Sequence, residues 1–330
     1  MAGAAAVCAT AALRTGAGLV TVACPRDVVP SMQALCPCAT CLPLPEDADE
    51  AWALLLPALE RADALVAGCG IGQETFSAKL IARLVPWLCE HQLPAVLDAD
   101  ALNLLAAMNC FPIGVGDDFS AINPSLLLHP VQPQLDDDGA EESVVSHKNT
   151  LNPSQTLRLP DRVVLTPHLG EASRLLGVPV ATLETRQVEA ARALRRRYGG
   201  SVVLKSASTV LIGADGEAIN LYGSAAMAKG GSGDALAGVL GALLAGQRAY
   251  GLQGVRLLQT ACALHGMAGL LAVEARGERG TLATDLCDAL GRVPDVMERA
   301  VIGVTPHAQR LDSQYGFETI SMHDSSEETA

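Results

Sequence analysis

The sequence contains very few aromatic residues, since phenylalanine, tyrosine and tryptophan make up only 3% of its 330 residues. Alanine, leucine, glycine and valine dominate instead, and hydrophobic residues reach 49%, enough for a full buried core. This mixture suits parallel strands covered by alanine-rich helices better than an all-β sandwich. The length is sufficient for one large α/β domain or for two small ones.

Positive charge is also scarce. The chain has 23 lysines and arginines against 36 aspartates and glutamates, which gives a formal net charge of −13. Neutralising a nucleic-acid backbone takes lysine and arginine, so we expect no nucleic-acid partner. Nucleotides are not excluded, because backbone N–H groups can hold their phosphates.

Long uninterrupted apolar runs are missing as well, because glycine or charge breaks each one before it reaches membrane-spanning length. The N-terminus lacks the basic start and the long apolar centre of a signal peptide. The ten cysteines stand mostly in apolar runs, where they behave as small buried hydrophobes. These features predict a protein of the reducing cytoplasm with no membrane partner.

Three cysteines, Cys36, Cys38 and Cys41, form a tight C-x-C-x-x-C cluster. Structural zinc sites usually take four ligands, and no paired cysteine or histidine motif supplies the rest of such a set. We therefore favour packing for this cluster and keep a metal site as the alternative.

Helix and strand signals alternate along the chain, which predicts an α/β fold with a mostly parallel central sheet flanked by helices. The expected helices are an N-terminal one that stops at Gly16 and Gly18, and those at about 47–61, 74–91, 100–107, 170–177, 182–197, 233–246 and 255–275. The expected strands cover residues 19–23, 63–67, 94–98, 162–166, 202–205, 209–212 and 217–221.

Residues 108–160 break this alternation. They contain scattered proline and glycine and an acidic run at 136–138, without a stable period. A loop of that length is unusual inside a compact domain. We expect a surface insertion within a single domain of residues 1–310, followed by a polar, disordered tail at 311–330.

The strongest chemical signal is the turn GGSGD at 230–234, which precedes the apolar helix ALAGVLGALLAG. Glycines at a helix start let backbone N–H groups converge on an anion, and the helix dipole adds to the attraction. A carboxylate in the first turn can then accept a proton from a substrate hydroxyl that attacks phosphorus. The plainer alternative is a helix start stabilised by an aspartate, by about 1 kcal/mol or less.

Further motifs accompany this turn in a fixed order. They are ALRTGAGLVTVA at 12–23, DADALNLL at 98–105, TPHLGEASRLLG at 166–177, VVLKSASTVLIG at 202–213, MAKGGSGDALAG at 227–238 and HGMAGLLAVEARGERGTLATDL at 265–286. In these motifs the chain resembles the nucleotide-dependent NAD(P)H-hydrate dehydratases, a ribokinase-like family. The resemblance covers residues 2–107 and 160–300.

The resemblance implies an enzyme that repairs damaged NADH and NADPH. Such an enzyme dehydrates the S epimer of NADHX or NADPHX to NAD(P)H, with ADP or ATP as phosphoryl donor and Mg²⁺ as cofactor. It also implies a homo-oligomer, commonly a tetramer in relatives, and a functional pairing with a separate NAD(P)HX epimerase, since this chain lacks the epimerase domain fused upstream in some relatives. The resemblance leaves the choice between ADP and ATP as phosphoryl donor open and weakly favours ADP.

The resemblance assigns site residues position by position. Asp234 is the base that faces the ring hydroxyl. The substrate-binding positions are Ala4, Gly70, His168 and Asp234. The nucleotide-binding positions are Lys205, Ser206, Ala207, Ser208, Thr209, Gly231, Ser232 and Gly233, of which the last three form the anion hole.

Several of these residues have a structural alternative. His168, a candidate for the group that takes the ring proton, could merely cap the next helix. Lys205 could be a solvated edge charge, and Gly70 could only permit a positive φ. Asp98 and Asp100 could coordinate Mg²⁺ on the nucleotide or cap the following helix; we favour capping for Asp100 and leave Asp98 open.

The sequence also departs from the family pattern. Cys69 replaces a usual proline in the GCGIG loop at 68–72, and Ser206 and Ser208 replace glycines, which would crowd the nucleotide. Relatives carry a strand and a glycine-rich turn ahead of the helix that begins at Met1, so we expect unpaired sheet edges.

Two rival functions remain. A ribokinase-like small-molecule kinase would share the GGSGD turn but release a phosphorylated product. A non-catalytic nucleotide-binding protein would fit the missing strand and the altered glycines.

Overall fold

A computed structural model describes residues 1–108, 157–294 and 296 of the chain. Residues 109–156 of the predicted insertion and the predicted tail at 311–330 lie outside the described residues. By its contacts the chain divides into two compact units, Met1–Leu290 and Gly291–Ala330, and all elements given below belong to the first. The predicted domain of residues 1–310 stays a prediction.

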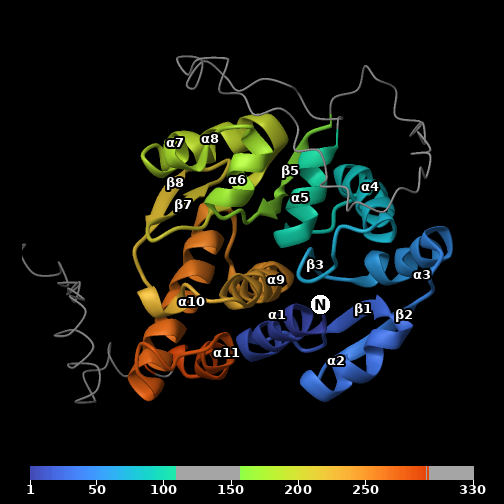
Figure 1. The fold of residues 1–330 in the computed structure, drawn as a ribbon, viewed down its shortest axis with the longest axis horizontal. Coiled ribbons are helices and arrows are strands. Elements are labelled where there is room, and N and C mark those ends of the chain that lie inside the picture. The colour runs from blue at the N-terminus through green and yellow to red at the C-terminus, as the bar shows by residue number, and fades with distance from the viewer. Residues whose placement is uncertain (109–156, 295, 297–330) are drawn as a thin grey trace, which may run out of the picture. The chain divides into compact units, whose positions relative to one another are not determined.

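Six strands form the main sheet, in the order β3-β4-β5-β6-β7-β8 (Figure 1). They are β3 (Leu65–Ala67), β4 (Ala95–Leu97), β5 (Leu159–Leu165), β6 (Gly199–Leu204), β7 (Thr209–Ile212) and β8 (Glu217–Asn220). Strands β3 to β6 pair in parallel, while β7 and β8 are antiparallel. The predicted α/β fold with a mostly parallel sheet is confirmed.

A separate two-stranded parallel sheet joins β1 (Thr21–Pro25) to β2 (Thr40–Leu44). Strands β1 and β3 are therefore both edge strands within the described residues, as the sequence predicts. The difference from the sheet interior is visible in burial. All three residues of β3 are only part-buried, whereas all three of the neighbouring β4 are inaccessible to solvent.

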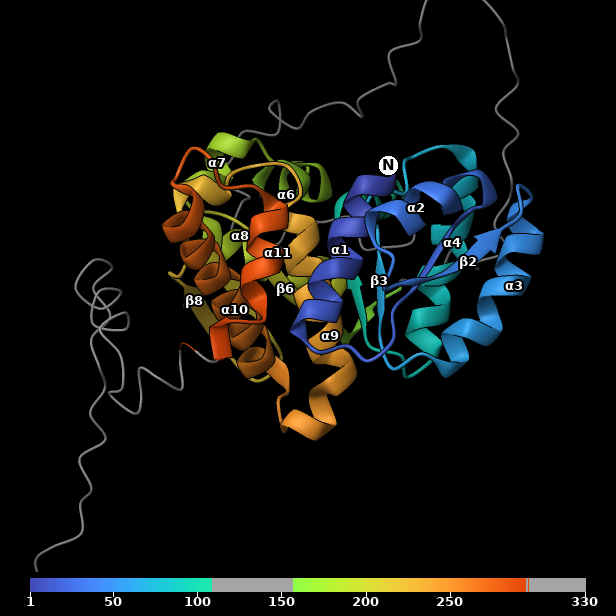
Figure 2. The ribbon, with the colours of Figure 1, turned by 90° about the horizontal axis from the view of Figure 1, so that it is seen from below.

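Helices cover both faces of the main sheet (Figures 1 and 2). One face carries α4 (Thr75–Glu90), α5 (Ala99–Ala107), α6 (Leu169–Leu176) and α8 (Gln187–Tyr198). The other face carries α9 (Ser232–Tyr250) and α10 (Gly254–Arg276), with α1 (Ala2–Thr15) and α11 (Ala283–Leu290) packed outside them. The remaining helices are α2 (Val29–Leu35), α3 (Ala48–Arg61) and α7 (Val180–Glu184), with 3-10 turns at Arg26–Val28 and Ala225–Met227.

The burial of the central strands explains why their sequences are continuous apolar runs. Leu97, Leu165 and Val202 stand opposite one another across β4, β5 and β6, and all three are fully buried. Strands covered on both faces have no solvent side, so they do not alternate in polarity.

The sequence prediction differs from the structure in several elements, and helices α2 and α11 were not predicted. The single helix expected at 182–197 is two helices, α7 and α8, because Arg186 between them has a non-helical backbone (φ −139°, ψ 49°). Strand β2 was not predicted, since Pro43 lacks the N–H that an interior strand needs. The strand tolerates Pro43 because β2 lies at the edge of its sheet.

Among the described helices, α10 is long and apolar enough to cross a membrane by length and composition. It contains Gly266 and Gly269, and 56% of its most apolar stretch is buried within the protein. A core helix of a water-soluble protein has the same properties, so this one helix is weak evidence for a membrane span.

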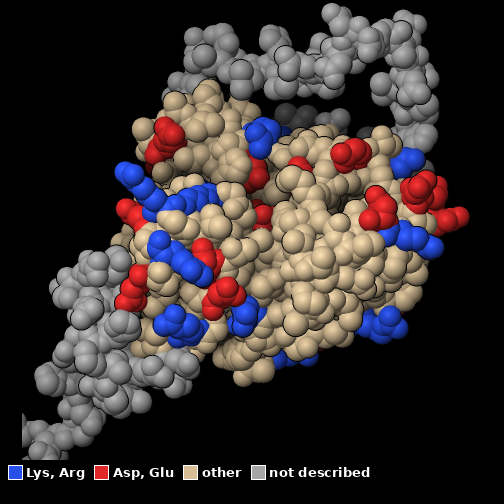
Figure 3. Space-filling view, turned by 60° about the horizontal axis from the view of Figure 1, so that its bottom comes forward, with Lys and Arg blue, Asp and Glu red and all other residues tan. Residues whose placement is uncertain are grey.

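Charged side chains of both signs are interspersed on the face shown in Figure 3, and a broad area between them carries neither sign. Helices α1 and α2 together contribute one charged side chain, Arg14. The N-terminal helix α1 therefore packs mainly through small apolar residues, and its one charged residue forms an exposed ion pair with Asp288 of α11.

Gly238 permits the close contact between α9 and α1. A Cβ atom at this position would lie 2.1 Å from the carbonyl oxygen of Cys8 and 3.0 Å from Cβ of Ala11. We expect Gly238→Ala to force the two helices apart and to lower the free energy of unfolding by about 1–3 kcal/mol, as overpacking does. Urea denaturation measures this, with Gly3→Ala as the matched control on α1, because nothing lies within 4 Å of its Cβ position. Equal stability of the Gly238 variant and the wild type would contradict the argument.

Candidate active site

Four parallel strands deliver their following loops to one edge of the sheet. Strands β3, β4, β5 and β6 lead into Gly68, Asp98, Thr166 and Lys205 respectively. Helix α9 also begins at this edge, since Gly233 in its first turn lies beside Lys205. In open α/β sheets, ligands bind at the carboxyl ends of the strands, so this edge is the candidate site.

The start of α9 is built to hold an anion. Gly231 precedes the helix with a left-handed φ of +92°, and no side chain caps the first turn. The N–H of Ser232 donates to the carbonyl of Lys229 at 3.3 Å, while the N–H groups of Gly231 and Gly233 meet no side-chain cap and suit an acceptor such as phosphate. The anion hole at Gly231, Ser232 and Gly233 stays a prediction.

Gly233 meets the side chain of another predicted nucleotide-binding residue. A Cβ atom on Gly233 would lie 3.1 Å from Nζ of Lys205 and 3.8 Å from Oδ2 of Asp98. Glycine therefore leaves room for a positive charge beside the helix start. Lys205 is not a solvated edge charge, because only 18% of its side chain is exposed to solvent.

Asp98 is the partner of Lys205. Its carboxylate is 1% exposed, and Oδ1 accepts hydrogen bonds from Lys205 Nζ at 2.6 Å and from Thr166 Oγ1 at 2.8 Å. Burial disfavours the Lys205 ammonium, but the carboxylates of Asp98 and Glu171 outweigh this and raise the pKa of Lys205. The lysine is therefore a fixed cation at neutral pH.

Asp234, the predicted base, lies half-buried in the first turn of α9. Its carboxylate, that of Asp98 and the thiol of Cys69 lie within 4.8 Å of one another. Burial raises the pKa of Asp234, the thiol of Cys69 and Lys205 lower it, and Asp98 raises it again. The net shift is upward, which makes Asp234 a stronger proton acceptor than an ordinary aspartate.

His168 caps α6, as the structural alternative proposed. Its Nδ1 accepts hydrogen bonds from the N–H groups of Gly170 (2.9 Å) and Glu171 (3.3 Å), while Glu171 accepts the N–H of His168 (2.8 Å). Burial, Lys205 and Arg174 lower the pKa of His168. An accepting Nδ1 leaves the single proton of the neutral ring on Nε2, 3.4 Å from Glu171 Oε1. In this arrangement neither ring nitrogen is free to take a substrate proton.

The remaining nucleotide residues form the turn between β6 and β7. Ser206 Oγ donates to Gln187 Oε1 (2.7 Å) and accepts the N–H of Ser208 (3.1 Å), and Thr209 Oγ1 donates to the carbonyl of Ser206 (3.1 Å). Ala207 and Ser208 are exposed. The serine that replaces a glycine at 206 therefore has partners within the turn and on α8.

The two predicted substrate positions near the N-terminus lie side by side. Gly70 has a positive φ of +72°, and a Cβ atom there would lie 3.1 Å from Cβ of Ala4. Cys69, which precedes Gly70, belongs to the Asp234 group. The loop at 68–72 thus links this pair to the predicted base.

The prediction for Asp100 was wrong. Asp98, and not Asp100, occupies the position before α5, and its side chain does not cap the helix. Asp100 instead accepts hydrogen bonds from the N–H of Gly72 and from Gln73 Nε2, both at 3.0 Å, and so holds the glycine loop against α5. The backbone turn at Ala99 directs Asp98 into the site and Asp100 towards the loop.

Metal ligands were also predicted as an alternative at Cys36, Cys38 and Cys41. Within the described residues, the one group of three potential metal ligands is Cys69, Asp98 and Asp234, and it contains none of these cysteines. Cys36 is buried and accepts a hydrogen bond from Thr10, which fits the packing interpretation.

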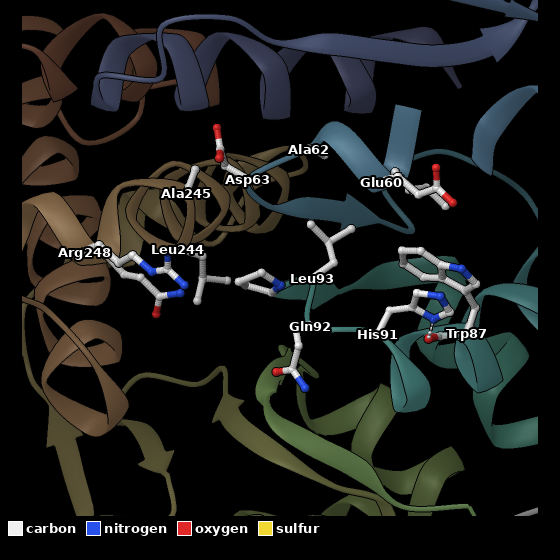
Figure 4. Close-up of a pocket in the computed structure, with 13 residues that line it drawn as sticks. Glu60, Ala62, Asp63, Trp87, His91, Gln92, Leu93, Leu244, Ala245 and Arg248 are labelled. Atoms are coloured by element: carbon white, nitrogen blue, oxygen red, sulfur yellow. Dashed lines mark hydrogen bonds between the residues drawn. The ribbon is translucent and has the colours of Figure 1, made fainter. Parts of the chain in front are cut away.

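A cavity of about 410 Å³ lies at the opposite end of α9 (Figure 4). Trp87 and His91 stack there with ring centroids 4.1 Å apart, and Arg248 and Asp63 also line it. None of the predicted site residues lines this cavity. It lies at the amino ends of β3 and β4, away from the edge where the carboxyl ends and the helix start converge.

Sequence reasoning missed His265, which supports the anion hole. Its Nε2 lies 2.9 Å from the carbonyl oxygen of Ser232 and therefore donates a hydrogen bond to it. Burial lowers the pKa of His265 to about 4, with the Ser232 carbonyl opposing that shift. The histidine opens one of the family-like motifs, HGMAGLLAV, which was the available signal.

The lowered pKa of His265 makes stability depend on pH. The unfolded chain takes up a proton at this histidine near pH 6.5, whereas the folded protein does so only near pH 4. The free energy of unfolding should therefore fall as pH drops through this window, by at most about 1.4 kcal/mol per pH unit. Denaturant unfolding at several pH values tests this, and His265→Gln should have a smaller slope than the wild type. Identical slopes would count against the assignment.

Comparison with known proteins adds independent findings. The sequence model of a family described as NAD(P)H-hydrate dehydratase matches residues 1–114 and 142–292. The chain is 34% identical over 293 residues to a bifunctional NAD(P)H-hydrate repair enzyme of Escherichia coli, which covers 88% of this chain and 45% of that protein. It is 32% identical over 233 residues to an ADP-dependent (S)-NAD(P)H-hydrate dehydratase of Neisseria meningitidis. This match covers 69% of this chain and 61% of that protein. The chain spans about half the length of the bifunctional relatives it matches.

Solved structures show the same fold. A ribokinase-like superfamily protein of Enterococcus faecalis superposes with a TM-score of 0.62 at 24% identity, over 88% of this chain and 81% of that one. An ADP/ATP-dependent NAD(P)H-hydrate dehydratase of Bacillus subtilis, co-crystallised with ATP and Mg²⁺, superposes with a TM-score of 0.59 at 24% identity. The superposition covers 89% of this chain and 85% of that one. The predicted ribokinase-like fold is confirmed.

Proposed function

The chain belongs to the NAD(P)H-hydrate dehydratase family, and from this we propose that it dehydrates the S epimer of NADHX or NADPHX to NAD(P)H, with ADP or ATP as phosphoryl donor. One observation carries the proposal: a half-buried carboxylate, Asp234, stands in the first turn of a helix whose N–H groups are uncapped. A base and an anion site at one helix start suit phosphoryl transfer to a hydroxyl.

The chemistry explains the need for a nucleotide. Hydroxide is a poor leaving group, whereas phosphate is a good one. In the proposed reaction the ring hydroxyl oxygen attacks the terminal phosphorus, and Asp234 takes the hydroxyl proton. The bond from phosphorus to the rest of the nucleotide breaks, so that ATP leaves as ADP, or ADP as AMP. The lone pair of the ring nitrogen then expels phosphate, and loss of the neighbouring ring proton restores the dihydronicotinamide.

The residues of the site have separate tasks in this scheme. The N–H groups at Gly231, Ser232 and Gly233 bind the phosphates, and the loop at 205–209 with Lys205 lines the nucleotide. Ala4, Gly70 and His168 border the hydrate, with His168 acting through its helix cap and not as a base. Such preorganised donors stabilise charge that develops on the transferring group.

The donor set of the site also fits Mg²⁺. The carboxylate oxygens of Asp98 and Asp234 are the ligand type that this ion prefers, whereas the thiol of Cys69 is not. When bound together with the nucleotide, Mg²⁺ would neutralise phosphate charge.

The test is recovery of the dihydronicotinamide absorbance. Purified protein is mixed with NADH hydrate and Mg²⁺, and with ADP or ATP in separate cuvettes. Recovery of NADH together with free phosphate supports the dehydratase and identifies the donor. A stable phosphoester would instead indicate the kinase, and nucleotide binding without turnover would indicate the non-catalytic protein.

We further propose a cytoplasmic location, a homo-oligomeric state and cooperation with a separate NAD(P)HX epimerase. Six cysteines are buried as thiols in the protein interior, which supports a reducing compartment: Cys8, Cys24, Cys36, Cys69, Cys262 and Cys287. The E. coli relative is described as a bifunctional repair enzyme, of which this chain matches 45% of the length. The two activities of that relative support functional cooperation between the dehydratase and an epimerase.

A further inference from the structure

Asp98 stands in a position where its side chain would normally cap a helix, yet it does not do so. It precedes α5 with an extended backbone (φ −131°, ψ 167°), and no cap hydrogen bond forms. The next residue, Ala99, has a φ of +48° and is the one non-glycine residue with positive φ in the described part of the chain. Such strain costs about 1 kcal/mol or more and persists where the surroundings over-determine it, often at functional sites.

Neighbouring loops hold the Asp98 backbone in place. A Cβ atom at Gly68 would lie 1.7 Å from the carbonyl oxygen of Asp98, so only glycine allows this approach. The N–H of Asp98 donates to the carbonyl of Ala67, and the N–H of Thr166 donates to that of Leu97. Asp98 is thus fixed between the ends of β3 and β5.

The side chain of Asp98 contacts Lys205 through one oxygen and directs the other towards the start of α9. Thr166 and Lys205 both donate to Oδ1, while Oδ2 points towards Gly233, 3.8 Å from its Cβ position. The base of Lys205 is fixed as well, because its N–H donates to the carbonyl of Pro167 at 2.8 Å. Both ends of this long and flexible side chain are therefore held.

The ammonium held in this way lies at the helix start. Nζ of Lys205 is 3.1 Å from the Cβ position of Gly233, in the turn whose N–H groups are uncapped. A phosphate bound at these N–H groups would meet the ammonium directly. A lysine acts as a point charge on such a phosphate, and its effect depends on where its flexible stem places it.

We propose that Asp98 is a positioning residue, which together with Thr166 holds the Lys205 ammonium against the terminal phosphoryl group of the nucleotide at the start of α9. The inference rests on the proposed function for its phosphoryl-transfer step. It assigns Lys205 to the transferring group rather than to the adenine end of the nucleotide. Lys205 offsets the negative charge on that group, and in this role Asp98 acts through Lys205.

Binding measurements test the placement of Lys205 without any turnover. We expect the wild type to bind ATP more tightly than AMP, since only ATP carries the terminal phosphoryl group. In Asp98→Asn this preference should fall roughly tenfold, because a charge-assisted contact is loosened. Thr166→Val keeps both charges and loosens only the orientation of Asp98, so it should cause a smaller loss in the same direction.

Kinetics separate positioning from general damage. Asp98→Asn and Thr166→Val should lower kcat by roughly ten- to a hundredfold, as misplacement of a catalytic group does, with a smaller change in the KM for the hydrate. Asp98→Glu, which keeps the charge, should restore part of the loss. Asp288→Asn, an exposed aspartate of α11 paired with Arg14, is the matched control and should behave as the wild type.

Each outcome decides between the two proposals. Loss of the preference for ATP over AMP in both variants supports the positioning of Lys205, even when the wild type restores no NADH, in which case the proposed function alone fails. Should Asp98→Asn not fold, Thr166→Val carries the test. An unchanged preference for ATP over AMP in a folded variant would overturn the positioning role while leaving the dehydratase in place.

Discussion

Asp234→Asn is expected to lower the turnover of NADH hydrate by roughly 10²- to 10⁴-fold, the range that a general base contributes. The amide cannot accept the hydroxyl proton, but it has nearly the shape of the carboxylate. Nucleotide binding should survive, because it depends on the uncapped N–H groups of α9 and on Lys205. Steady-state rates and calorimetric titration with ADP and ATP measure the two properties separately.

The control for this variant is again Asp288→Asn, since Asp288 is exposed and lies on α11 rather than at the site. Its rate should match the wild type. An Asp234→Asn protein that keeps the full rate of NADH recovery would refute the proposed base. Loss of nucleotide binding together with activity would instead indicate a folding role for Asp234.

Lys205→Met is expected to lower the free energy of unfolding by about 3 kcal/mol. Removal of one partner of a buried ion pair leaves the other charge uncompensated, at a cost of about 3–5 kcal/mol. We take the lower end because 18% of the Lys205 side chain is exposed, against 2% of Asp98. Asp98 keeps only its hydrogen bond from Thr166 in this variant.

The double variant Asp98→Asn with Lys205→Met distinguishes an unpaired charge from lost packing. Removing both charges should restore most of the stability lost in Lys205→Met, because no buried charge then lacks a partner. Urea denaturation of the wild type, both single variants and the double variant completes the cycle. If the losses of the two single variants simply add in the double variant, the ion pair does not explain the stability of this edge.

The sequence by itself determined the fold class and the chemistry of α9. Alternating helix and strand signals predicted β3 to β8 and the principal helices to within a few residues, because period and turn chemistry are local properties. The GGSGD turn predicted Asp234 as the base and an anion hole for the same reason, since a glycine-rich helix start is encoded in consecutive residues. Family-like motifs then supplied the expected substrate.

Only the tertiary structure decided which side chains act together. Thr166 lies 68 positions after Asp98 in the sequence, and Lys205 lies 107 positions after it. The three residues meet because β4, β5 and β6 end at the same edge of the sheet. The sequence left Asp98 open and assigned capping to Asp100, because both stand near a helix start. The choice depends on the backbone turn at Ala99 and on the close approach of Gly68, which are properties of packed loops rather than of local sequence.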